Sequence, residues 1–172
     1  MILLKKLFAL SSLILIISLI FSSCSKKAAL REFSPEKSFS LHMKAEKDGK
    51  NFEADITCLN SEDIKIAFTF PGELSGFSVT TEKDGYAVNI FGLTDELTAA
   101  EINNASLLNI LTKALKTSVF TNHGLFTADE NGYNANLTID SIPVSVSFSP
   151  DGFLQKITCE TLNFSAQFEI DR

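Results

Sequence analysis

The chain has 172 residues, 45% of them hydrophobic and 21% charged, with 21 acidic against 15 basic side chains. This length provides for one domain of ordinary size with a hydrophobic core of its own. The acidic excess repels phosphate backbones, so we expect no nucleic acid among the partners.

Residues 1–23 have the pattern of a secretory signal peptide. Lys5 and Lys6 form a short basic region, and residues 7–21 form an apolar core that contains three serines. This core is shorter than the roughly 20 apolar residues that span a bilayer comfortably. Without residues 1–23, 13 basic and 21 acidic side chains remain, a net charge of −8. An uncleaved helical anchor is the alternative interpretation, and it also tethers the domain to a membrane.

Phe21-Ser22-Ser23-Cys24 resembles the lipobox of bacterial lipoproteins, which has an aliphatic residue three positions before the cysteine and small residues between them. The two serines fit this pattern, while Phe21 is bulkier than the usual leucine. The resemblance implies that Cys24 becomes the first residue of the mature protein and carries a lipid. We therefore expect a bacterial lipoprotein that lies outside the cytoplasm and is anchored to the cell membrane by its lipidated cysteine.

Residues 24–37 then form the lipidated cysteine and a polar tether, and residues 38–172 form a single β-rich domain. The domain contains two cysteines, Cys58 and Cys159. Outside the cytoplasm these could form a disulfide, and the alternative is two small buried side chains on strands. Two cysteines make no spacing pattern, so we favour the unpaired state.

Strict alternation of apolar and polar residues predicts five short strands between residues 39 and 90. Asp48-Gly49 and Asp84-Gly85 are hairpin signals, and Pro71-Gly72 ends the third strand. These turns make the five strands a meander of antiparallel neighbours. Their apolar positions are Phe39, Leu41, Met43, Ala45, Phe52, Ala54, Ile56, Cys58, Ile64, Ile66, Phe68, Phe70, Phe77, Val79, Tyr86, Val88 and Ile90.

Between residues 95 and 119 the period changes to that of a helix. Apolar residues recur at helical spacing from Leu107 to Leu115, and Asn104 or Ser106 is able to cap the start. Alternation then resumes. Five more strands are predicted at residues 124–129, 132–140, 142–148, 153–159 and 161–170.

The predicted elements constrain the architecture. Ten strands spaced about 4.8 Å apart make a flat sheet nearly 50 Å wide, whereas a helix of about twelve residues is only about 18 Å long. One helix cannot cover the apolar face of such a sheet. We therefore expect a mainly β (α+β) domain in which a strongly curved antiparallel sheet of about ten strands, a half-barrel, wraps around one central helix.

Five short segments carry a resemblance to known proteins: residues 39–45, 48–55, 70–76, 92–93 and 142–146. In this order they resemble a set of small clostridial-type lipoproteins of uncharacterised function, whose domain is similar to the outer-membrane lipoprotein carrier fold. Cys58 and Cys159 depart from that pattern. The resemblance implies a half-barrel with a cavity for acyl chains.

The apolar strand surface exceeds what one helix covers, which indicates a non-catalytic binding module. Its concave face would bind an apolar or lipid-like ligand. The alternative is that the same side chains are ordinary core residues. The candidate ligand-binding residues are Phe68, Phe70, Ile90, Val146 and Phe148.

The chain has no recognisable catalytic or metal-binding motif. Its two histidines, His42 and His123, have no partners at metal-ligand spacing. We expect no enzyme activity, cofactor or metal. The alternative to ligand binding is an envelope sensor or accessory subunit that contacts another envelope protein through its polar face or an edge strand.

Overall fold

The computed structural model describes residues 35, 37–60, 63–83, 85–98, 101, 106–120 and 126–170. Cys24, the signal peptide and most of the tether lie outside this part of the chain. Lipidation and anchoring therefore stay predictions. Among the described residues, no helix is long and apolar enough to cross a membrane.

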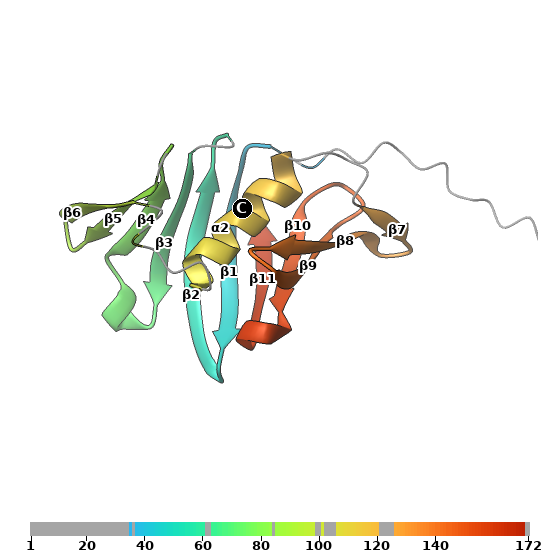
Figure 1. The fold of residues 1–172 in the computed structure, drawn as a ribbon. Helices are drawn as coiled ribbons and strands as arrows, with labels where there is room; N and C mark the ends of the chain where they lie inside the picture. Colours follow the sequence, from blue (N-terminus) through green and yellow to red (C-terminus); the bar gives the residue numbers. More distant parts are fainter. Residues whose placement is uncertain are drawn as a thin grey trace, which may run out of the picture. The chain divides into compact units, whose positions relative to one another are not determined.

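The described domain is mainly β, as predicted, with an antiparallel sheet and one α-helix. The strand order is β6-β5-β4-β3-β2-β1-β11-β10-β9-β8-β7, so the sheet is open, with β6 and β7 as its edges. Helix α2 lies over one face of the sheet (Figure 1), which we call the inner face. The elements are β1 (Phe39–Lys47), β2 (Lys50–Cys58), β3 (Ile64–Phe70), η1 (Gly72–Leu74), β4 (Phe77–Thr81), β5 (Gly85–Ile90), β6 (Leu93–Thr98), α2 (Leu107–Phe120), β7 (Thr127–Asp129), β8 (Gly132–Ile139), β9 (Ile142–Phe148), β10 (Leu154–Cys159), η3 (Glu160–Leu162) and β11 (Phe164–Ile170).

The structure has eleven strands rather than ten, because β6 occupies residues assigned to the helical region. Ile90 and Leu93 pair directly, which leaves Phe91 and Gly92 as a two-residue turn. Both turn residues have positive φ, 50° and 88°, the conformation that tight hairpins require. The turn brings residues 93–98 antiparallel to β5, and their pairing with β5 overrides their helical propensity.

Helix α2 begins after Ser106, one of the two predicted caps. The Ser106 Oγ accepts a hydrogen bond from the backbone N–H of Asn109, at 3.2 Å, and thereby satisfies one of the free donors at the helix start. The helix packs against β8 and β9. Its buried side chains are Asn109, Ile110, Leu111, Thr112, Ala114, Leu115, Ser118 and Val119.

The last strand is shorter than predicted. Residues 160–162 form the short helix η3, and Asn163 adopts a left-handed conformation with φ 46° before β11 starts. Asparagine tolerates this conformation better than most residues. β11 then pairs with β1, which joins the first and last parts of the chain in one sheet.

The two domain cysteines are buried and unpaired, as favoured from the sequence. Cys58 pairs with Phe39, the first residue of β1. Cys159 pairs with Phe164, which lies opposite Lys47, the last residue of β1. Strands β1 and β11 lie between them, so they are too far apart for a disulfide. Burial raises the pKa of the Cys58 thiol to about 11, which makes it a poor nucleophile near neutral pH.

Candidate functional site

A line of apolar side chains crosses the inner face from the core to the edge strand β6. The ring centroids of successive phenylalanines along this line lie 6.3 Å (Phe164 and Phe52), 6.0 Å (Phe52 and Phe68) and 5.4 Å (Phe68 and Phe77) apart. Beyond them, Phe77 pairs with Ile90, and Ile90 pairs with Leu93. We call these six residues the apolar row: Phe164, Phe52, Phe68, Phe77, Ile90 and Leu93.

A small residue on β1 lets the row continue through the centre of the sheet. Ala45 lies directly between Phe52 on β2 and Ala166 on β11. Its methyl group leaves space for the rings of Phe52 and Phe164 to stack, with an interplanar angle of 20°. A larger side chain at residue 45 would separate the two rings.

Exposure to solvent increases along the apolar row. Phe164 and Phe52 are 3% and 9% exposed, Phe68 and Phe77 are half-buried, and Ile90 and Leu93 are 48% and 79% exposed. We call Phe68, Phe77, Ile90 and Leu93 the open end of the row. These residues lie on four adjacent strands, β3 to β6. The open end is therefore an apolar surface that continues into the core.

Helix α2 covers the two parts of the inner face unequally. The main core contains its buried side chains together with those of β1, β2, β3 and β8 to β11. A second, small cluster consists of Val79, Tyr86 and Val88, and Leu108 is the helix residue that packs against it. The strands β4 to β6 thus contribute little to the main core, and α2 contacts them at Leu108 and at the Tyr86 hydroxyl.

Polar contacts link α2 to both parts of the sheet. The Tyr86 hydroxyl on β5 lies 2.8 Å from Thr112 Oγ1 and 3.4 Å from Asn109 Oδ1. On the other side, Asn109 Nδ2 and Lys113 Nζ donate to Asp140 Oδ2, at 2.9 and 2.6 Å. Lys113, and then Asn109, lower the pKa of the Asp140 carboxyl. These bonds keep the helix in place over the sheet.

Phe70 lies on the outer face, so the prediction that it shares a face with Phe68 is wrong. Ala54 pairs with Phe68 but Glu53 pairs with Phe70, which leaves Thr69 as an extra residue in β3. This β-bulge shifts the alternation by one residue, and Phe70 therefore lies on the same side as Glu53. An alternating sequence pattern gives no sign of such a bulge.

The other four predicted ligand-binding residues lie on the inner face, but in two places. Phe68 and Ile90 belong to the open end of the row. Val146 and Phe148 lie in the main core, 2% and 1% exposed, and the Phe148 ring packs edge-on against Phe126. A ligand reaches these two only if the core opens. Whether any of the predicted residues contacts a ligand stays a prediction.

Sequence reasoning missed Phe77 and Leu93 as members of the open end. Leu93 was assigned to the segment before the helix, and Phe77 was an ordinary strand position. The feature that identifies Leu93 is the Phe91-Gly92 turn, which pairs it with Ile90.

A separate hollow of about 660 Å³ lies near the end of β11. Phe153, Leu154, Phe168 and Ile170 contribute its apolar lining, together with four polar residues. Ile170 is 51% exposed. This hollow is thus a second, partly apolar recess on the described surface.

His42 lies on the outer face between two carboxylates. Its Nδ1 is 2.8 Å from Asp55 Oδ1 and its Nε2 is 3.3 Å from Glu53 Oε2. Asp55 raises the pKa of the His42 imidazole, and Glu53 adds to the effect. His123 lies outside the described residues, among which there is no group of ligating side chains that could hold a metal ion.

No family model and no curated protein matches the chain. It is similar to an uncharacterized conserved protein from Thermus thermophilus, with a TM-score of 0.44 and 9% identity, covering 78% of this chain and 80% of that chain. It is also similar to a LolA superfamily protein from Nitrosomonas europaea, with a TM-score of 0.42 and 10% identity, covering 82% of this chain and 87% of that chain. At these values the likeness carries no information about function, and the resemblance to clostridial-type lipoproteins stays a prediction.

Proposed function

We propose that the chain is a membrane-anchored bacterial lipoprotein that binds an apolar or lipid-like ligand at the open end of the apolar row, without catalysis. The observation that carries this proposal is the increase in exposure from Phe164, at 3%, to Leu93, at 79%. Water contacts the open end in the free protein, so a ligand that covers it gains hydrophobic free energy, roughly 0.8 kcal/mol for each buried methylene.

The shape of the open end fits a chain-like ligand. Its four side chains lie opposite one another across β3 to β6, a width of about 14 Å at the usual strand spacing. An acyl chain that lies across these strands contacts Phe68, Phe77, Ile90 and Leu93 in turn. Its end meets Phe52, where the row enters the core.

The contacts of Asn109 support a curved half-barrel. In a flat sheet, β5 and β8 would lie eight strand spacings, about 38 Å, apart. Yet the Asn109 side chain contacts both Tyr86 on β5 and Asp140, the residue after β8. We infer that the sheet bends around α2, so that the apolar row lies on its concave side.

The proposed lipid anchor gives this surface a source of ligand. A lipidated Cys24 would keep the domain next to a membrane, with the tether of residues 24–37 setting its reach. Lipids, or the acyl chains of other lipoproteins, are then the apolar molecules nearest the open end. The net charge of −8 after signal-peptide removal disfavours strongly anionic head groups.

Native mass spectrometry of the chain from residue 25 onward, before and after organic extraction, tests the proposal. We expect extra mass that leaves with the solvent. Leu93→Asp places a charge in the open end and should abolish this mass, because a ligand tail cannot desolvate a carboxylate. Ile170→Asp is the matched control, since Ile170 is also an exposed apolar residue but lies at the separate hollow.

Each result of this experiment has a definite meaning. Loss of the extra mass only in Leu93→Asp supports the open end as the ligand site. Loss only in Ile170→Asp moves the ligand to the hollow near β11. A folded protein with no extra mass in any form contradicts ligand binding.

A second function, contact with another envelope protein, is favoured by Phe91. Its side chain is 73% exposed at the β5–β6 turn, two residues before Leu93, and its ring lies beside Gly76, where an added Cβ would be 2.9 Å from the ring. A protruding aromatic residue at a turn is a typical anchor for a partner protein. Two results together would support this function. Native mass spectrometry would show the protein without a ligand, and the protein would capture a partner protein that the Phe91→Ala variant does not capture.

A further inference from the structure

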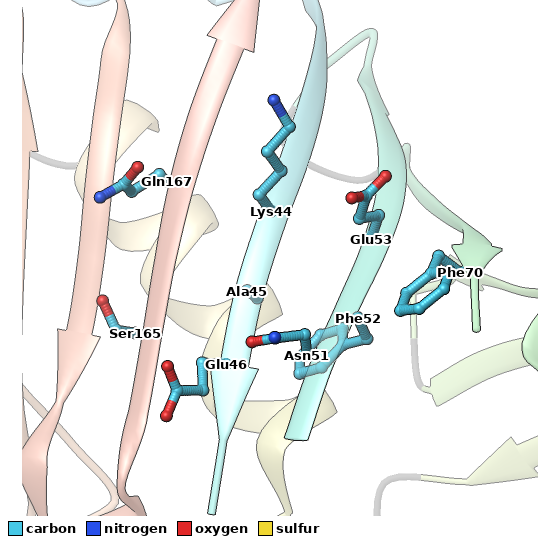
Figure 2. A pocket seen from close by; sticks show the side chains of 9 residues that line it. All are labelled: Lys44, Ala45, Glu46, Asn51, Phe52, Glu53, Phe70, Ser165 and Gln167. Carbon is cyan, nitrogen blue, oxygen red and sulfur yellow. The ribbon is translucent and has the colours of Figure 1, made fainter. Parts of the chain in front are cut away.

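The outer face has a groove that the proposed function does not use. It has a volume of about 420 Å³ and crosses β11, β1, β2 and the end of β3. Figure 2 shows the groove from the side opposite α2, with Gln167 and Ser165 at one end and Phe70 at the other. The four strands span about 14 Å at the usual spacing, so the groove is long enough for an extended ligand that lies across them.

The strand register arranges the lining side chains in two lines. Ser165, Glu46 and Asn51 lie opposite one another on β11, β1 and β2. In the second line, Gln167 and Lys44 lead to Glu53, which pairs with Phe70. The groove therefore has a polar floor on three strands and an aromatic residue at one end.

Phe70 reaches this groove only because of the β-bulge at Thr69. Without the bulge, alternation would place it on the inner face after Phe68. The ring is instead 49% exposed on a polar surface, where burial against the core cannot stabilise it. It presents one apolar surface to any molecule in the groove.

Several polar groups of the floor are free to bind a ligand. Among the described residues, the side chains of Asn51, Ser165 and Gln167 have no hydrogen-bond partner. Their amides and hydroxyl provide both donors and acceptors. The Lys44 ammonium is bonded to Glu169, with its Nζ 2.9 Å from both carboxylate oxygens. Lys44 is therefore not counted among the groups that are free to bind a ligand.

The charges of the groove disfavour anionic ligands. Glu46 and Glu53 repel anions, and the Lys44 ammonium is neutralised by Glu169. Glu46 and Glu53 lie on the adjacent strands β1 and β2, and Glu53 is also bonded to His42.

We propose that the groove binds a neutral oligosaccharide. Sugar hydroxyls both donate and accept hydrogen bonds, which matches the amides of Asn51 and Gln167 and the hydroxyl of Ser165. The apolar C–H face of a sugar ring packs on an aromatic ring, which matches Phe70 at the end of the groove. The polar floor of this site lies on the opposite face from the open end of the row, although Phe52 of the row is also among the residues that line the groove.

Saturation-transfer NMR with the full chain, in a detergent without a sugar head group, tests this proposal. The probes are maltotetraose, cellotetraose and chitotetraose, with tetraalanine as a neutral probe that has amides but no sugar ring. We expect saturation transfer to at least one tetrasaccharide and none to tetraalanine. Signals from the sugar ring C–H protons should be the strongest, because these protons lie against Phe70.

Variants distinguish the groove from other surfaces. Phe70→Ala should weaken the binding of the tetrasaccharide about tenfold. Asn51→Ala should weaken this binding about fivefold, because one hydrogen bond is lost. Leu59→Ala, which truncates an exposed apolar residue outside both the groove and the apolar row, is the matched control and should leave the affinity unchanged. Thermal unfolding of each variant checks that the fold is retained.

Three results would overturn the proposal. These are no saturation transfer to any of the three tetrasaccharides, transfer that Phe70→Ala and Asn51→Ala leave unchanged, or equal transfer to tetraalanine. Failure here leaves the inner-face ligand site unaffected, because Leu93→Asp and native mass spectrometry test that site separately.

Discussion

The inner face of the sheet has two regions that differ in what covers them. Over β1, β2 and β8 to β11, the apolar side chains pack with α2 in the main core, where Leu115 is fully buried. Over β4 to β6, the small cluster around Val88 meets the helix through Leu108 and through the Tyr86 hydroxyl, and Leu93 stays 79% exposed. Strands β4 and β5 alternate apolar and polar residues as the core strands do, so the alternation of these strands does not distinguish the two regions.

The difference follows from the dimensions of the elements. A 14-residue helix is about 21 Å long and covers only part of an eleven-stranded sheet. The strands that α2 covers form a core and provide stability. The strands beyond it keep apolar residues that the core does not use, and we assign the ligand site to these residues.

Truncation of one leucine in each region should give the largest difference. Leu115→Ala removes a fully buried side chain and should lower the free energy of unfolding by about 2–5 kcal/mol. Leu93→Ala removes an exposed side chain and should change it by no more than about 0.5 kcal/mol. Urea unfolding of both variants measures this difference. Similar losses in both would mean that Leu93 is covered in solution and the two regions are equivalent.

Tyr86→Phe should have an intermediate effect, because it removes the hydroxyl that joins β5 to the helix. We expect a loss of about 1 kcal/mol, the usual contribution of one hydrogen bond. Thr112 keeps a partner, since its Oγ1 also bonds to the Leu108 carbonyl at 2.8 Å. A double-mutant cycle with Thr112→Ala isolates the coupling. A coupling near zero would show that the Tyr86 hydroxyl does not anchor the helix.

Asp140→Asn should have the smallest effect, and the effect should depend on pH. Lys113 and Asn109 lower the pKa of Asp140 below its ordinary 3.8, so the ionised carboxylate stabilises the fold at higher pH. This contribution is complete above pH 3.8 and disappears as the pH falls through the lowered pKa. Asparagine is the suitable replacement because residue 140 has φ 49°, which asparagine tolerates.

Unfolding of the wild type and Asp140→Asn at several pH values measures this contribution. The small difference between them at pH 7 should vanish in strong acid, whereas the effect of Tyr86→Phe should stay constant over the same range. A difference between wild type and Asp140→Asn that does not change with pH would contradict the assigned role of Asp140.

Local patterns predicted most of the elements. Alternation located β9 with its observed bounds, 142–148, and Ser106 caps α2 as predicted. The pattern failed where pairing between strands decides the structure. Residues 93–98 form β6 because the Phe91-Gly92 turn pairs them with β5.

The candidate site was less predictable than the fold. The bulge that turns Phe70 outward is visible only from the β2–β3 register. The apolar row depends on the pairing of β1 with β11, strands from opposite ends of the chain. Neither contact has a local signal in the sequence. Phe77 and Leu93 were missed because the pairing of β4 and β6 with β5 is what places them beside Ile90.

The central claim, an open apolar surface that binds a chain-like ligand, has a direct optical test. The chain has no tryptophan, so Leu93→Trp introduces a single fluorophore at the open end. Leu59→Trp is the matched control, because Leu59 is also exposed, at 66%, but lies beyond the end of β2 and outside the row.

Both variants are titrated with a fatty acid that carries bromine on its chain and quenches tryptophan on contact. A ligand at the open end should give saturable quenching and a blue shift for Leu93→Trp, with little change for Leu59→Trp. Equal quenching of both tryptophans, or quenching of neither, would contradict the central claim.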